Sequence, residues 1–182
     1  MHVLQYIAVK PKGKFDMDEL EQFKEEAFDE VKYKFDEMYS ESEGLGGWSD
    51  WYVVGGGRYN SNPDNQYEEK NAWNDVISYA ETPDKFVETI TRAMESRMAE
   101  FNGYRGRFEQ QKIDLKEKFN AYDGSMDYSM ELYDLSKCID MLQGKWNMDS
   151  YFYDLNNWST NPKWVLDSLD DSWYLVPVDF HF

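Results

Sequence analysis

Cysteine is almost missing from this sequence, and so are long apolar runs. Cys138 is the single cysteine among 182 residues, so an internal disulfide cannot form. No apolar stretch approaches the roughly 20 residues that a membrane-spanning helix needs. The start, MHVLQYIAVK, is too short and too polar afterwards for a signal peptide. We therefore expect a cytoplasmic protein with no membrane partner.

Motifs that would reveal a catalytic site are missing too. The glycines at 55–57 match neither of the two common phosphate-binding spacings, and Cys138 lies in a helical pattern that favours packing over nucleophilic chemistry. Carboxylate pairs are abundant, and none is set apart from the rest as an acid–base pair. His2, His181 and Asp179 come together if the first and last strands pair, but they lack the additional ligands of a metal site. We predict no catalytic residue, no metal and no cofactor.

What the sequence has in excess is negative charge. It contains 36 acidic and 19 basic residues, which gives a formal net charge of −17, whereas a small soluble domain usually carries a net charge of magnitude about 2 to 8. The excess is uneven. Residues 16–43 hold twelve acids and three bases, a net −9, while residues 85–118 hold eight bases and six acids, a net +2. One region is therefore predicted to form a dense anionic surface.

Apolar periodicity predicts the elements of the first two thirds. Residues 3–10 are typical of an inner strand, because both faces are apolar, and residues 20–39 form an amphipathic helix pattern. A short strand is expected at 51–54. A second helix begins with Thr82 as N-cap and Pro83 as its first residue. Gly103 and Gly106 are expected to interrupt it, and further helical patterns follow as far as Gly144.

The last third adds a strand at 151–154, a short helix at 162–169 and a closing strand at 173–182. Pro177 lies within this closing strand and predicts that it is an edge strand or carries a bulge. We therefore predict an α+β fold in a single domain, residues 1–182. It has a small, mostly antiparallel sheet packed with the acidic amphipathic helix, and a helical insert at about 82–144.

The acidic helix is the main candidate for a binding surface. Its apolar stripe faces the sheet, which leaves Glu21, Glu25, Asp29 and Asp36 in water. Twelve carboxylates over residues 16–43 give one about every 3.3 Å at the rise of an α-helix, close to the phosphate spacing of about 3.4 Å along one DNA strand. This density favours imitation of nucleic acid, and the alternative is a merely solvated face.

Three other residues are candidates for partner contact. Arg58 follows the glycines and can grip an anion beside their backbone N–H groups, although a plain tight turn explains the same segment. Trp158 and Trp164 belong to an aromatic region with Tyr151, Phe152 and Tyr153. That region is either a protein-contact surface or a small satellite core. The basic residues between 85 and 118 are diluted by Glu, so we expect no direct binding of nucleic acid.

Part of the chain resembles a known class of proteins. The residues Trp51, Tyr52, Gly55, Gly56, Arg58 and Tyr59, the closing run Val178, Asp179, Phe180 and His181, and the acidity are similar to small proteins of bacteriophages and prophages. Within that group the chain resembles an anti-CRISPR inhibitor of Cas9. Such inhibitors share no common fold or active site, so no residue role is carried over.

The resemblance implies a mode of action. It implies a non-enzymatic protein in the bacterial cytoplasm that binds Cas9, with or without guide RNA, and prevents DNA engagement or cleavage. Two alternatives stay open. One is an enzyme of phage metabolism that uses carboxylates or the terminal histidines, and the other is an adaptor that binds a basic host protein.

Overall fold

The fold is built around a five-stranded sheet. The computed structural model describes residues 1–13, 16–41, 49–65, 72–120, 129–145 and 150–181. The strands are β1 (His2–Val9), β2 (Trp51–Val54), β3 (Ile77–Ser78), β4 (Phe152–Asp154) and β5 (Tyr174–His181). Their order is β2–β5–β1–β4, with β3 also paired to β5. β4 runs parallel to β1 and the other pairs are antiparallel. The predicted α+β class and mostly antiparallel sheet are confirmed.

The two terminal strands form the middle of this sheet. β1 and β5 are paired over their whole length, from His2 opposite His181 to Val9 opposite Tyr174. β1 lies between β5 and β4, which confirms the predicted inner strand. Side chains alternate between the faces of a strand. Val9 therefore joins the apolar cluster on one face of the sheet, and Ala8 joins the cluster on the other.

The prediction that Pro177 places its strand at an edge or a bulge is wrong. β5 is central, and its register with β1 runs through Pro177 without interruption. The N–H and C=O of one residue point to the same neighbour in an antiparallel pair, and the Pro177 carbonyl accepts from the Gly55 N–H at 2.7 Å. The nitrogen of Pro177 therefore faces the side of β5 where β2 and β3 pair. On that side β2 ends opposite Val178 and β3 begins opposite Leu175, so Pro177 lies in the gap between them. Because no strand pairs there, a proline fits in a central strand.

The helix α1 (Leu20–Glu41) covers one face of the sheet, after a short turn, η1 (Met17–Glu19). The Asp16 carboxylate begins the turn by accepting from the Asp18 N–H at 3.0 Å. Apolar residues at three- and four-residue spacing then bury one side of α1. Phe35 is fully buried and meets Phe180 of β5 edge to face, with ring centroids 5.6 Å apart. The helix predicted at 20–39 is confirmed.

The long helix α2 (Pro83–Asn120) covers the opposite face with its first turns. It begins at Pro83, as predicted, because proline lacks only a donor that the first turn leaves unpaired. Phe86 and Ile90 pack with Phe152 and Leu175 of the sheet, and Val165 of the short helix α4 (Lys163–Asp167) joins them. The first part of the range predicted as an insert, 82–144, therefore belongs to the core.

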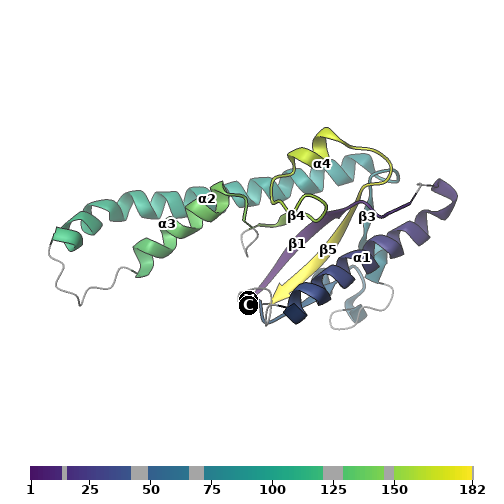
Figure 1. Cartoon of the computed structure of the whole chain (residues 1–182), viewed down its shortest axis with the longest axis horizontal. Coiled ribbons are helices and arrows are strands. Elements are labelled where there is room, and N and C mark those ends of the chain that lie inside the picture. Colours follow the sequence, from purple (N-terminus) through teal and green to yellow (C-terminus); the bar gives the residue numbers. More distant parts are fainter. Residues whose placement is uncertain (14–15, 42–48, 66–71, 121–128, 146–149, 182) are drawn as a thin grey trace.

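Beyond the sheet, α2 continues as the first helix of a two-helix hairpin, which we call the α2–α3 arm (Figure 1). The predicted interruption at Gly103 and Gly106 is wrong, since α2 is one helix of 38 residues. Each glycine costs about 1 kcal/mol in a helix, and packing against α3 (Ser129–Leu142) offsets that cost. α3 runs antiparallel to α2 and ends before Gly144, as predicted. None of the described helices is both long enough and apolar enough to cross a bilayer.

Candidate functional site

The predicted contact residues of α1 lie on one exposed stripe. Glu21, Glu25 and Asp29 follow at four-residue spacing and Asp36 seven residues later, so the four share a helix face. All four are exposed, as are Asp16, Asp18 and Glu19 in the turn before the helix. The buried side of α1 is anchored on the sheet, so the acidic stripe is presented by a fixed element.

Two of these carboxylates already have partners within the chain. Glu21 accepts from the Lys24 ammonium at 3.1 Å, and Lys24, which is almost fully buried, also pairs with Glu81 at 2.8 Å. Burial alone lowers the pKa of Lys24, but the hydrogen bonds to Glu81 and Glu21 outweigh it and the pKa is raised. Asp36 accepts from the Tyr52 hydroxyl. Among the described residues, Glu25 and Asp29 have no such partner, so they are the carboxylates best placed for a partner.

The carboxylates on the exposed face of α1 are spaced more widely than the phosphates of nucleic acid. Residues four apart on a helix are separated by about 6 Å along its axis, whereas phosphates of one DNA strand repeat at about 3.4 Å. The exposed stripe therefore carries charge at roughly half the density of a phosphate strand. Glu26, Glu30 and Glu37 lie on the flank and are half-buried. The likeness to nucleic acid is one of electrostatic field, with no phosphate-by-phosphate register.

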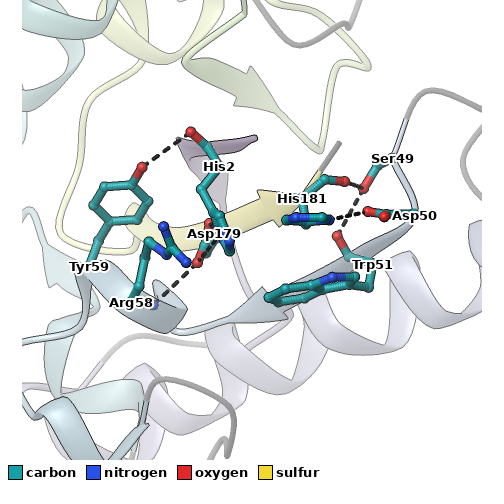
Figure 2. A network of polar contacts seen from close by, with 8 residues as sticks. All are labelled: His2, Ser49, Asp50, Trp51, Arg58, Tyr59, Asp179 and His181. Carbon is teal, nitrogen blue, oxygen red and sulfur yellow. Dashed lines mark hydrogen bonds and ion pairs between the residues drawn. The ribbon is translucent and has the colours of Figure 1, made fainter.

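A second polar site lies at the end of the sheet where His2 and His181 meet (Figure 2). The rings are 4.7 Å apart, and Trp51 stacks on His181 at 5.0 Å with an interplanar angle of 14°. His2 Nδ1 lies 2.9 Å from a carboxylate oxygen of Asp179, and His181 Nδ1 lies 2.6 Å from Asp50. The hydrogen bond with His181 lowers the pKa of Asp50.

Asp179 is fully buried, and its carboxylate accounts for the glycine turn. It accepts from His2 and, at 3.2 Å, from the backbone N–H of Arg58. The glycine turn leads into the short 3-10 helix η3 (Gly57–Tyr59). Within this turn, Gly56 and Gly57 have positive φ angles of 92° and 48°. The anion that this backbone binds is therefore a carboxylate of the protein itself. The Arg58 side chain is exposed, and its role in partner contact stays a prediction.

A cleft of about 500 Å³ opens beside His2, between β1, η3 and α2. Its walls include Tyr6 of β1, Tyr59 of η3 and Arg92 of α2. The Tyr59 hydroxyl donates to the His2 carbonyl at 3.2 Å. Burial, together with the charge of Asp75, raises the pKa of Tyr6, so its hydroxyl stays protonated at neutral pH. The cleft therefore has among its walls His2, whose ring is held by Asp179, together with Tyr6 and Tyr59.

This arrangement has part of what acid–base catalysis requires. A carboxylate can only accept, so His2 donates its Nδ1 proton to Asp179, and in the neutral ring Nε2 is left as a potential base. A nucleophilic triad also needs a hydroxyl or thiol bonded to Nε2. In the part of the chain that the structure describes, the hydrogen bonds of the His2 ring go to Asp179. Nor do three His, Cys, Asp or Glu side chains converge on a metal position among the described residues.

The predicted aromatic surface is only partly a surface. Phe152 and Tyr153 are buried in the two apolar clusters, so for these two residues the core alternative holds, although the core is the main one and not a satellite. Trp158 and Trp164 are each 59% exposed. Trp164 lies on α4, whose Val165 packs on the α2 side of the sheet, while the acidic stripe lies on the α1 side. The predicted contact residues therefore do not form one site, because α1, Arg58 and Trp164 lie in different places.

Sequence reasoning missed part of the polar network and the cleft. His2, His181 and Asp179 were expected to meet if the terminal strands paired, and they do. Asp50 was not expected there, since its place depends on β2 pairing with Trp51 opposite His181. Alternation along β1 is the signal that would have placed Tyr6 on the same face as His2.

Comparison with known proteins adds no relative: no family model, no curated protein and no solved structure matches this chain.

Proposed function

We propose that this chain is a non-enzymatic phage counter-defence protein that binds a CRISPR–Cas9 effector and inhibits it. The observation that carries the proposal is the exposed acidic stripe of α1. Cas9-type effectors hold nucleic acid in a positively charged channel and read a short PAM with arginines. A helix with water-facing carboxylates complements either place in sign.

The way α1 is held adds to its fitness for this role. Its apolar side is buried on the sheet, so the backbone that carries the carboxylates is fixed before any partner arrives. Preorganised charges lose less entropy on binding than charges on a mobile segment. A net charge of −17 attracts a basic partner over distance and raises the association rate.

A double charge reversal tests the stripe. Glu25→Lys with Asp29→Lys changes two exposed carboxylates that have no described partner, so the fold is expected to survive. We expect binding to purified Cas9 to weaken by about tenfold or more, because repulsion replaces attraction at two points. Glu21 and Asp36 are left unchanged because they bond Lys24 and Tyr52. Binding is measured by surface plasmon resonance and inhibition by DNA cleavage.

The matched control reverses two exposed acids away from α1. Asp64→Lys with Asp171→Lys changes the net charge equally, from −17 to −13, since each reversal adds two units. We expect this control to bind more tightly than the α1 variant. If both variants lose the same affinity for Cas9, α1 contributes only through the net charge of the protein. If both variants bind Cas9 as tightly as the parent, the proposal is overturned.

An enzyme is the second candidate, and the pairing of His2 with Asp179 beside the cleft favours it. Titration of Cas9 with the protein separates the two. A binding inhibitor stops cleavage near one equivalent, whereas an enzyme acts well below one equivalent and its effect grows with time. His2→Gln should leave inhibition intact if the protein is a binder. If the protein does not bind Cas9 at all, the remaining alternative, an adaptor that binds a basic host protein, is favoured.

A further inference from the structure

The α2–α3 arm has its polar groups inside. Asp134 of α3 is fully buried, and one of its oxygens lies 3.1 Å from Arg107 Nε of α2. Glu131 is also buried, and the buried Arg97 guanidinium donates to the Met141 carbonyl at 3.1 Å. The face that α3 turns toward α2 is therefore rich in charged groups.

The outer side of α3, in contrast, carries exposed apolar residues. Leu132, Leu135, Ile139 and Leu142 recur at spacings of three, four and three residues, which is the a/d pattern of a coiled-coil seam. Leu132 is 52% exposed, Ile139 is 42% exposed and Leu142 is 76% exposed, while Leu135 is half-buried. We call these four residues the α3 stripe. Apolar side chains in such a seam are normally covered by a facing helix.

A groove lies next to one end of the α3 stripe. It has a volume of about 310 Å³, and Met94, Met98 and Phe101 of α2 line it together with Leu142. Met98 is itself 51% exposed. Methionine adapts its shape to an incoming side chain, so this groove can receive an apolar residue of a facing helix.

The arm differs from the rest of the chain in charge. Over residues 83–145 we count twelve acids and ten bases, a net charge of −2, although the whole chain carries −17. The residues that flank the α3 stripe on its exposed side, Ser136 and Gln143, are uncharged. The arm is therefore a part of the molecule that a second negatively charged copy can approach with little net repulsion.

We propose that the α3 stripe is a self-association surface and that its occupant is the α3 helix of a second copy, running antiparallel. This pairing is self-complementary, because Leu132 faces Leu142 of the second copy and Leu135 faces Ile139. Leu132 of one copy then lies beside the groove next to Leu142 of the other. The twofold axis passes near Ser136 and residue 138.

The same pairing keeps the acidic regions apart. The arm projects beyond the sheet, and α1 lies on the body of the molecule (Figure 1). Two arms that meet antiparallel at α3 place two weakly charged surfaces in contact. The dimer also presents two acidic stripes to partners. Self-association does not depend on the proposed function, since a monomer can bind Cas9 equally well.

Molar mass in solution tests the proposal. Sedimentation velocity and light scattering on the full chain, over a hundredfold range of concentration, should show a species of twice the 21.7 kDa chain mass. Ile139→Glu with Leu142→Glu changes two exposed residues and should raise the dissociation constant at least about 100-fold, because an unpaired carboxylate is costly to bury. Gln110→Glu, on an exposed part of α2, is the control and should dimerise normally. Circular dichroism checks that each variant is folded.

Cross-linking tests the antiparallel register. In a Cys138→Ser background, Ser136→Cys lies next to its own copy and should be joined by a short bis-maleimide. Gln143→Cys should not, because the two copies of residue 143 are about 18 Å apart along the helices. A chain that stays monomeric at every concentration, or a dimer unaffected by the double Glu variant, overturns the proposal. Cross-linking of Gln143→Cys in preference to Ser136→Cys overturns the antiparallel arrangement.

Discussion

Asp179 organises the end of the sheet at the scale of single residues. A buried carboxylate must be hydrogen-bonded or paired, and here the donors are His2 and the Arg58 N–H. The Arg58 N–H reaches Asp179 because Gly57 has no side chain. A Cβ at Gly57 would lie 2.7 Å from an Asp179 oxygen and 2.8 Å from its Cβ. Gly57 is therefore required by a carboxylate 122 positions later in the chain.

Gly57→Ala should be one of the most destabilising small substitutions in the chain. The added methyl group pushes Asp179 away from its donors, and the positive φ of 48° adds strain. We expect the free energy of unfolding to fall by about 1–3 kcal/mol. Chemical denaturation measures it, with Gly13→Ala as the control, because its Cβ meets nothing closer than 3.5 Å. Equal stability of the two variants would contradict the described turn.

The element scale shows where local sequence signals are sufficient. Pro83 predicted the start of α2, and Gly144 predicted the end of α3, since these residues act on the backbone next to them. Thr82 has the position predicted for the N-cap, but its hydroxyl donates to the Ser78 carbonyl at 3.3 Å. Gly103 and Gly106 misled the prediction because packing against α3 offsets their local cost. Pro177 misled it because the gap between β2 and β3 is a property of strand pairing. No local pattern reports such a gap.

The residues of the candidate sites also divide into those that a local sequence pattern predicts and those that depend on the pairing of distant segments. The water-facing positions of Glu25 and Asp29 could be predicted, because helical periodicity separates a buried from an exposed face. The approach of Asp50 to His181 could not, since it depends on the register of two distant strands. The α3 stripe was concealed for another reason. Periodicity assigns apolar residues to the inside, and α3 instead turns Asp134 inward.

Gly106→Ala tests whether α2 is continuous. A Cβ at Gly106 meets nothing within 4 Å, and the backbone there is helical. Alanine should therefore raise the free energy of unfolding by up to about 1 kcal/mol, measured as a higher denaturation midpoint. A helix interrupted at this position would gain nothing, or would lose stability. Hydrogen exchange across residues 103–107 gives an independent measure of continuity.

Charge separation is the main property of the whole molecule. The arm carries a net charge of only −2 over residues 83–145, and most of the negative charge lies in the rest of the chain. Electrostatic attraction acts over about 8–10 Å at 0.1–0.15 M salt, so it speeds encounter more than it holds a complex. Apolar contacts, which salt does not weaken, are expected to determine the dissociation rate.

Binding to Cas9 should therefore depend on salt mainly through the association rate. Between 50 and 200 mM NaCl we expect that rate to fall by about tenfold, while the dissociation rate changes little. Stopped-flow or surface plasmon resonance measures both rates, and sedimentation at each salt concentration shows whether the oligomeric state stays constant. The Glu25→Lys, Asp29→Lys variant should show a shallower salt dependence than the parent, because fewer attractive pairs are screened. An association rate that is flat across this range would remove electrostatic steering from the proposed function, and equal slopes for parent and variant would place the steering charge outside α1.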